Sequence, residues 1–246
     1  FFAAIFVTIS LAGALFVRPF LRLFVGRKAG LNDVVGYVLS FVSVIYGVLL
    51  GMLAVVTYQN LTEADRISSH EASTIAALYE DVGVYPDELA GKLRERLKQY
   101  TRHVIDVEWP LQKRGPVPLT QEENLGEFLR LLTSFELPPG SLQILHAETI
   151  REFNALIDLR RTRLHMASVS IPGIMWYTVV TGAILCMILI WLFDTTLMSQ
   201  FILGGVSAFG MSTMICLSAL MDNPFRGELS VSPAAFEAVL MALTNT

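Results

Sequence analysis

Charged residues are scarce in this chain of 246 residues, since only 16% of them are Asp, Glu, Lys or Arg. Ordinary soluble domains carry roughly a quarter of charged residues. Apolar residues make up 53% of the chain, and the mean hydropathy is +0.55. This composition excludes an ordinary water-soluble domain and indicates a membrane protein. A basic excess is also missing, because the formal net charge is −4, and this argues against a nucleic-acid-binding protein.

Cysteine is nearly absent, and the residue patterns of common catalytic and metal sites are missing. Cys186 and Cys216 lie inside apolar runs, so they indicate neither a disulfide framework nor a zinc site. The four histidines form no i, i+4 pair, and the chain has no HExxH, GxSxG, phosphate loop or GxGxxG motif. We therefore expect no metal, no cofactor and no enzymatic activity.

Long stretches without any charge locate the predicted membrane spans. About 20 apolar residues cross a bilayer, and a charge at its centre is costly. Four stretches of the chain are long enough: residues 1–17, 34–62, 164–193 and 195–221. We predict an all-α membrane protein whose four transmembrane helices form two pairs, at about 1–25, 33–60, 171–193 and 197–221. We interpret the first apolar run as part of a membrane helix rather than a signal peptide, because it lacks a basic leading segment.

Most charged residues lie between the two pairs of spans. Residues 61–170 hold 13 of the 18 Lys and Arg and 17 of the 22 Asp and Glu. Apolar residues recur there at spacings of three and four, which predicts a helical extramembrane domain. Breaks are expected at Gly83–Pro86, Pro110–Pro118 and Pro138–Gly140. The predicted organisation is thus 1–60, 61–170, 171–221 and a C-terminal segment, 222–246. Basic residues near the span ends are balanced, so charge does not decide the orientation.

Small or weakly polar residues form one stripe along the second predicted span. They are Gly36, Ser40, Ser43, Gly47, Gly51, Ala54 and Tyr58. Steps of three and four place them on one face of a helix. Such a stripe indicates close helix packing, because small residues let helix backbones approach in lipid. The alternative interpretation is that the stripe faces its own copies around a pore.

Glu71 is the most informative single residue, because it interrupts an apolar stripe that continues from Ile67 to Ile75. A buried carboxylate needs a partner. Arg160 offers one, since it lies on the apolar stripe of the helix that leads into the third span. We predict a buried ion pair between Glu71 and Arg160, with other partners for each as the alternative. Arg160, Arg161 and Arg163 also form a basic cluster before that span, which suits lipid headgroups or an anion-attracting ring.

Several motifs together resemble the bacterial bestrophin-like family, a domain of unknown function, over nearly the whole chain. They are Tyr46-Gly47 with Tyr58, Glu71-Ala72 followed by Leu78-Tyr79, Tyr100 before Glu108-Trp109-Pro110, Arg160-Arg161-Thr162-Arg163-Leu164, Pro172 with Trp176, and Asp222-Asn223-Pro224-Phe225-Arg226-Gly227-Glu228. The resemblance implies four membrane helices, a cytosolic helical domain between the second and third, and a homo-oligomeric ring that conducts chloride or another small anion. It also implies a pore lined by the second helix.

The resemblance does not imply calcium gating of this chain, because the cluster of acidic residues that binds calcium in bestrophins is not found in this sequence. The aromatic and aliphatic pattern of the bestrophin pore neck is not found either. The functional hypothesis is therefore a bestrophin-like anion channel in the lipid bilayer of a bacterial inner membrane, with its helical domain in the cytoplasm. The alternative is a non-conducting membrane subunit or scaffold of a larger complex. Copy number and symmetry of the native assembly distinguish the two.

Overall fold

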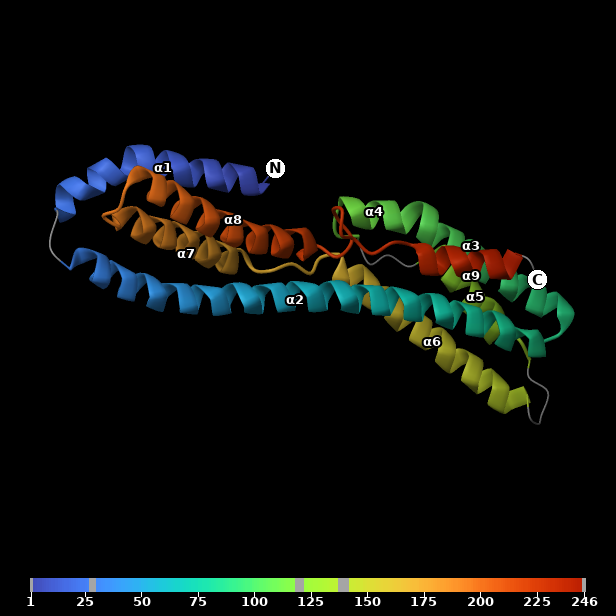
Figure 1. Cartoon of the computed structure of the whole chain (residues 1–246). Helices are drawn as coiled ribbons and strands as arrows, with labels where there is room; N and C mark the ends of the chain where they lie inside the picture. The colour runs from blue at the N-terminus through green and yellow to red at the C-terminus, as the bar shows by residue number, and fades with distance from the viewer. Residues whose placement is uncertain (1, 27–29, 118–121, 137–141, 245–246) are drawn as a thin grey trace. The chain divides into compact units, whose positions relative to one another are not determined.

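A computed structural model describes residues 2–26, 30–117, 122–136 and 142–244, and all regular structure within these residues is helical (Figure 1). The membrane-type helices are α1 (Phe2–Val25), α2 (Leu31–Asp81), α7 (Gly173–Leu192) and α8 (Leu197–Met221). The remaining elements are a 3-10 turn (Val82–Val84), α3 (Asp87–His103), a π-helix (Val104–Glu108), α4 (Trp109–Arg114), α5 (Glu123–Thr133), α6 (Leu142–Met166) and α9 (Ala234–Thr244).

The four helices that the sequence predicted to cross the membrane are confirmed by length and composition. Only the second differs strongly from its predicted extent, because α2 continues for a further 21 residues beyond the predicted end at residue 60. This polar half contains no Pro or Gly, so nothing in its local sequence ends the helix. The carboxylate at position 71 therefore lies on the same continuous helix as the apolar span.

The chain divides into two units. The apolar unit is Phe1–Gln59 with Ser170–Asp222, and the polar unit is Asn60–Val169 with Asn223–Thr246. The C-terminal segment, which the sequence suggested as a separate part, thus packs within the polar unit. In the apolar unit, α1, α7 and α8 lie side by side, and the first part of α2 completes the group (Figure 1).

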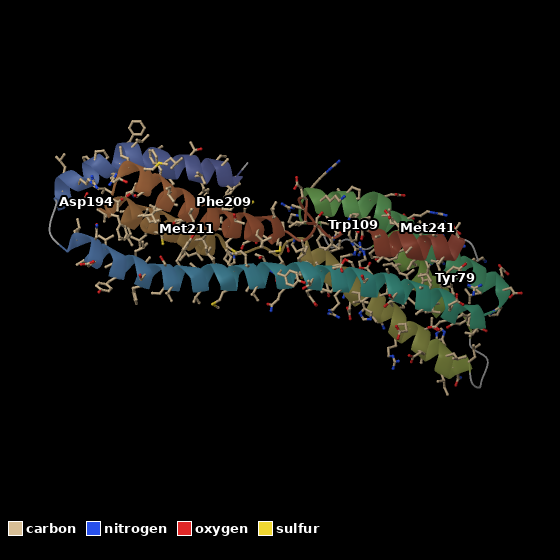
Figure 2. The ribbon with its side chains drawn as sticks, viewed as in Figure 1. Tyr79, Trp109, Asp194, Phe209, Met211 and Met241 are labelled. Carbon is tan, nitrogen blue, oxygen red and sulfur yellow. The ribbon has the colours of Figure 1, made fainter. Side chains whose placement is uncertain are left out.

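Polar contacts at the turn between α7 and α8 join three helices of the apolar unit. Arg22 in α1 forms an ion pair of 2.6 Å with Asp194, a residue of that turn (Figure 2). The buried Arg18 donates to the backbone oxygens of Phe193 and Thr195. Asn32, at the start of α2, accepts from the Asp194 backbone N–H at 2.8 Å and donates to its carbonyl at 3.1 Å. Arg18 and Arg22 therefore hold the turn between α7 and α8 against α1.

The breaks in the polar unit differ partly from those predicted. Gly83–Pro86 does separate α2 from α3. Pro110, expected to open a break, instead lies in the first turn of α4, directly after the π-helix. A proline is tolerated there because its missing N–H is not needed by the preceding turn. The chain leaves the helix only at Gly115. Pro118 and the predicted break at Pro138–Gly140 lie outside the described residues.

Candidate functional site

A cluster of buried charges lies in the core of the polar unit. Its members are Glu71 of α2, Glu108 of the π-helix, Arg160 and Arg163 of α6, with Tyr100 of α3 and Gln112 of α4. We call this set the charge cluster. Apolar residues surround it on the same helix faces, among them Ile67 and Ile75 on α2 and Leu156 on α6. The helical period that buries these residues also buries the charges between them.

Arg163 is the centre of the charge cluster and contacts three other members. Its Nε donates to Glu71 Oε2 at 2.7 Å, and its Nη2 lies 3.0 Å from Glu71 Oε1 and 2.6 Å from Glu108 Oε2. Its Nη1 donates to Gln112 Oε1 at 2.6 Å. The Tyr100 hydroxyl donates to Glu71 Oε1 at 2.5 Å. The guanidinium therefore uses all three of its nitrogens, which gives a fixed and directional arrangement.

The partner of Glu71 in the structure is Arg163 and not the predicted Arg160. Arg160 instead donates from Nε and Nη2 to Glu108 Oε1, at 2.9 and 2.6 Å. The two arginines are three residues apart on α6, so helical periodicity places both on nearly the same face and cannot choose between them. The predicted residues thus belong to one network, but Arg163 and Glu108 connect them.

The side chains of Glu71 and Arg163 are fully buried, and those of Glu108 and Arg160 are 3% and 8% exposed. Burial alone would lower the pKa of Arg163, but the Glu71 carboxylate outweighs burial and holds that pKa above its ordinary value. Burial raises the pKa of Tyr100 well above its ordinary value, and the negative charge of Glu71 raises it further. Two carboxylates face two guanidiniums, so the charge cluster is neutral when all four are ionised.

Aromatic rings close the charge cluster on one side. The Arg163 guanidinium lies 5.7 Å from the Trp109 ring and 5.5 Å from the Phe236 ring. Trp109 begins α4 (Figure 2), and Phe236 belongs to α9. Because these rings exclude water, they strengthen the electrostatic contacts beneath them and add cation–π attraction. The C-terminal helix is therefore part of the wall around Arg163.

Acid is expected to destabilise the polar unit through Glu108. Burial would raise the pKa of Glu108, but Arg163 and Arg160 outweigh it and hold that pKa below its ordinary value of 4.5. A lowered pKa contributes stability that is complete above pH 4.5 and is lost as pH falls through the folded-state pKa. Thermal unfolding measured from pH 7 downward should show this acid loss in the wild type. The loss should be shallower in Glu108→Gln than in Glu80→Gln, the control, because Glu80 is exposed. Equal acid losses in the two variants would contradict the assignment.

The small-residue stripe of α2 is open to the outside of the chain. Ser40, Ser43, Gly47 and Gly51 are exposed, and the Tyr58 side chain is 58% exposed. A Cβ built on Gly47 or Gly51 would meet no atom within 4 Å, and one on Gly36 would meet only Phe193, at 3.9 Å. The buried face of α2 is a different one, which contains Tyr46, Leu50 and Leu53. Packing within the described chain therefore does not bury the stripe.

The basic cluster before α7 divides into buried and exposed members. Arg160 and Arg163 point into the charge cluster, and only Arg161 is exposed, at 65%, where it pairs with Asp158 at 3.6 Å. The three arginines therefore do not form one headgroup-facing surface. Helical periodicity accounts for this division, because Arg160 and Arg163 lie about 60° apart around the helix axis whereas Arg161 lies about 100° or more from each of them.

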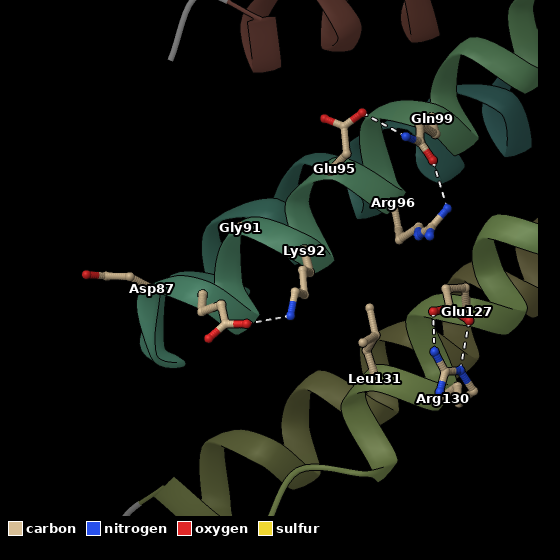
Figure 3. A pocket seen from close by; sticks show the side chains of 10 residues that line it. Asp87, Gly91, Lys92, Glu95, Arg96, Gln99, Glu127, Arg130 and Leu131 are labelled. Carbon is tan, nitrogen blue, oxygen red and sulfur yellow. Dashed lines mark hydrogen bonds and ion pairs between the residues drawn. The ribbon is translucent and has the colours of Figure 1, made fainter.

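The polar unit has clefts among its described residues. One of about 670 Å³ lies between α3 and α5 (Figure 3), and four of its charged side chains form the ion pairs Lys92–Glu88 and Arg130–Glu127. A smaller one of about 310 Å³ is lined by His103, Glu108 and Arg160. His103 Nε2 lies 4.0 Å from Glu108 Oε1. Within the described residues, no group of three or more His, Cys, Asp or Glu could hold a metal ion.

Sequence reasoning missed the roles of Tyr100 and Gln112 and the π-helix that brings Glu108 inward. The available signal was the apolar spacing from Leu97 through Val104 to Trp109, which shows a step of five. A step of five departs from the α-helical period and is typical of a π-turn, an element often found at functional sites.

Comparison with known proteins supports the resemblance seen in the sequence. The model of the bestrophin-like domain matches residues 4–236. No curated protein matches the sequence significantly. A bacterial bestrophin homologue from Klebsiella pneumoniae has a similar structure, with a TM-score of 0.63 and 12% identity over 99% of this chain and 96% of that one.

A crystal structure described as a membrane protein variant gives a TM-score of 0.66 at 11% identity, again over 99% of this chain and 96% of the other. At such low identity these structures show the shared fold alone. The four apolar helices and this fold make the chain an integral membrane protein. The match of the domain model over nearly the whole length decides the family, so the chain belongs to the bestrophin-like family.

Proposed function

We propose that the chain forms a homo-oligomeric ring in the membrane that conducts chloride or another small anion through a pore lined by the α2 stripe. The observation that carries this proposal is the open stripe, where glycines at positions 47 and 51 face free space although small residues normally mark close helix contacts. In a lone chain this surface would face lipid. Around a common axis, the same surface of several copies would enclose a lumen.

The chemistry of the stripe suits a small anion. Residues 34–62 contain no charge, so the lining would hold no carboxylate that repels anions. Hydroxyl groups at Ser40, Ser43 and Tyr58 are exposed there and can donate hydrogen bonds to a passing anion. By likeness to the bacterial homologue, we also propose that the chain lies in a bacterial inner membrane with its polar unit in the cytoplasm.

In the proposed channel, the charge cluster is a positioning element, because it holds the polar half of α2 against α6.

The test is a bulky apolar residue at Gly47, where an added Cβ would meet no atom of the described residues within 4 Å. We expect Gly47→Leu to abolish anion flux into liposomes while leaving the native mass of the oligomer unchanged, because leucine narrows and dries the lumen. Gly210→Leu is the matched control, since Gly210 in α8 also faces open space but lies on another helix. Its flux should equal that of the wild type.

The competing function is a non-conducting membrane subunit or scaffold that uses the α2 stripe to dock on another helix. In that case Gly47→Leu should separate the assembly, since small residues there permit close approach. Wild-type liposomes without any flux, combined with a Gly47→Leu protein of reduced mass, would reject the channel. Intact mass with blocked flux would reject the scaffold.

A further inference from the structure

The exposed stripe of α2 has a carboxylate at its start. Asp33 lies in the first turn of α2, directly before the uncharged residues 34–62, and it is exposed. Asp33, Ser40 and Gly47 follow one another at intervals of seven residues. An α-helix turns by about 100° per residue, so residues seven apart lie only about 20° apart around its axis. Asp33 therefore lies on the same face as the stripe, about 21 Å along the axis from Gly47.

Basic side chains of the described residues do not neutralise Asp33. It forms an ion pair with none of them, and the two arginines of the preceding helix α1 are engaged at the turn between α7 and α8. Arg22 pairs there with Asp194 at 2.6 Å, and the buried Arg18 donates to backbone oxygens of the same turn. The partly positive start of α2 stabilises a carboxylate in its first turn, but it does not remove the charge.

Asp33 is also the only charged residue that the sequence places on α2 within the apolar unit. That part of the helix ends at Gln59, and residues 34–62 carry no charge. The exposed polar side chains of the stripe there include the hydroxyls of Ser40 and Ser43. A hydroxyl donates and accepts hydrogen bonds but carries no charge. The electrostatic character of this face of the apolar unit is therefore set by one carboxylate at its end.

Assembly around an axis would multiply this charge. In the ring of the proposed function, the stripe of every copy faces the common axis. Rotation about that axis leaves equivalent residues at the same level, so each copy would add one Asp33 carboxylate to a ring at one mouth of the pore. Rings of Asp or Glu side chains favour cations in channels, and hydrogen-bond donors further along the pore do not cancel such a barrier to anions.

We propose that Asp33 is a specificity-determining residue of the pore, whose carboxylate at one mouth opposes the entry of anions and favours that of small cations. The inference rests on the proposed function, because it needs a lumen lined by the α2 stripe. It goes beyond that function, since an uncharged lining with hydroxyl donors would by itself favour anions. With Asp33 at its mouth, the pore should prefer anions over cations only weakly.

The experiment measures the reversal potential of the purified full chain in planar lipid bilayers under a KCl gradient, which gives the permeability ratio of chloride to potassium. Charges that line an opening change the local concentration of ions by about 10- to 1,000-fold, so we expect Asp33→Asn to raise this ratio roughly tenfold at low salt. At about 1 M salt the Debye length is about 3 Å instead of about 10 Å at 0.1 M. The difference between Asp33→Asn and the wild type should therefore become much smaller at high salt.

Two control variants separate ion selectivity from a role in starting the helix. Asp87→Asn is the matched control, because Asp87 is also exposed and lies in the first turn of a helix, α3. Each substitution removes a charge that interacts favourably with a helix N-terminus, so both variants should lose a similar, small amount of thermal stability. Only Asp33→Asn should change the permeability ratio. Asp33→Glu keeps the charge and should retain the ratio of the wild type.

The outcomes distinguish this inference from the proposed function. If the wild type carries chloride and Asp33→Asn has the same permeability ratio at low salt, the selectivity role of Asp33 is wrong and the proposed function stands. If the wild type carries potassium alone and Asp33→Asn reduces that current, the role of Asp33 is supported and anion conduction is wrong. An equal change of ratio in Asp87→Asn would overturn the assignment to Asp33. A wild type that carries neither ion would overturn both proposals.

Discussion

Arg163→Met is expected to lower the free energy of unfolding of the polar unit by about 3 to 5 kcal/mol, the usual cost of stranding a buried charge. The substitution leaves Glu71 fully buried with the Tyr100 hydroxyl as its one remaining partner among the described residues. It also removes the donor to Gln112 and one donor to Glu108. For a chain of this length, such a loss corresponds to a fall in Tm on the order of 10 °C, which fluorescence-detected unfolding in detergent can measure.

The matched control is Arg161→Met, two residues away on α6. Arg161 is 65% exposed and has a single ion pair of 3.6 Å, so its loss should cost less than about 1 kcal/mol. A double variant gives a sharper test. Glu71→Met combined with Arg163→Met removes one charge of each sign and leaves Glu108 paired with Arg160. This double variant should be more stable than Arg163→Met alone. A double variant that loses the sum of the two single losses would reject a coupled network.

Gly13→Ala is expected to be the most damaging single-methyl substitution in the apolar unit. A Cβ at position 13 would lie 2.0 to 2.5 Å from three atoms of the Trp191 ring. The ring cannot simply withdraw, because it is 9% exposed and its Nε1 donates to the Ser10 carbonyl at 3.1 Å. Overpacking of this kind costs about 1 to 3 kcal/mol or more, and it separates α1 from the C-terminal end of α7.

Gly210→Ala, in the same unit, is expected not to destabilise the protein. Gly210 also lies within a membrane helix, but an added Cβ there would meet no atom within 4 Å. Alanine is a better helix former than glycine by roughly 0.8 to 1 kcal/mol, so this variant should unfold at the wild-type temperature or slightly above it. Thermal unfolding of the two variants in one detergent measures the contrast. If both lose the same stability, close packing at Gly13 is not the cause.

The two sets of small residues illustrate why sequence alone cannot assign a stripe. Gly204, Ala208 and Ser212 in α8 are buried, and a Cβ on Gly204 would lie 2.9 Å from Ser10 Oγ. The α2 stripe has the same composition and spacing but is exposed. Composition and spacing show only that another helix could pack closely there. Whether that neighbour belongs to the same chain depends on the path of the other helices.

In the charge cluster, too, the sequence predicts one feature and not another. Spacing along α2 is enough to place Glu71 on a buried face, because the helical period is a local property of the chain. The partner of Glu71 is not determined by local sequence. Arg163 and Arg160 are equally placed by the period of α6, and the choice between them depends on where the π-helix brings Glu108. Arg160 binds Oε1 of Glu108, and Arg163 binds Oε2 through its Nη2. The Nε of Arg163 therefore remains available for Glu71.

Length and charge of the apolar runs determined by themselves that this is a four-helix membrane protein, because the cost of burying a charge in lipid is local, large and independent of the rest of the fold. The family resemblance came from short motifs spread over the chain. The tertiary structure alone decided the ion partners in the polar unit and the exposure of the α2 stripe. Those features depend on how close separate helices approach one another, and contacts between distant segments leave no periodic signal in a single sequence.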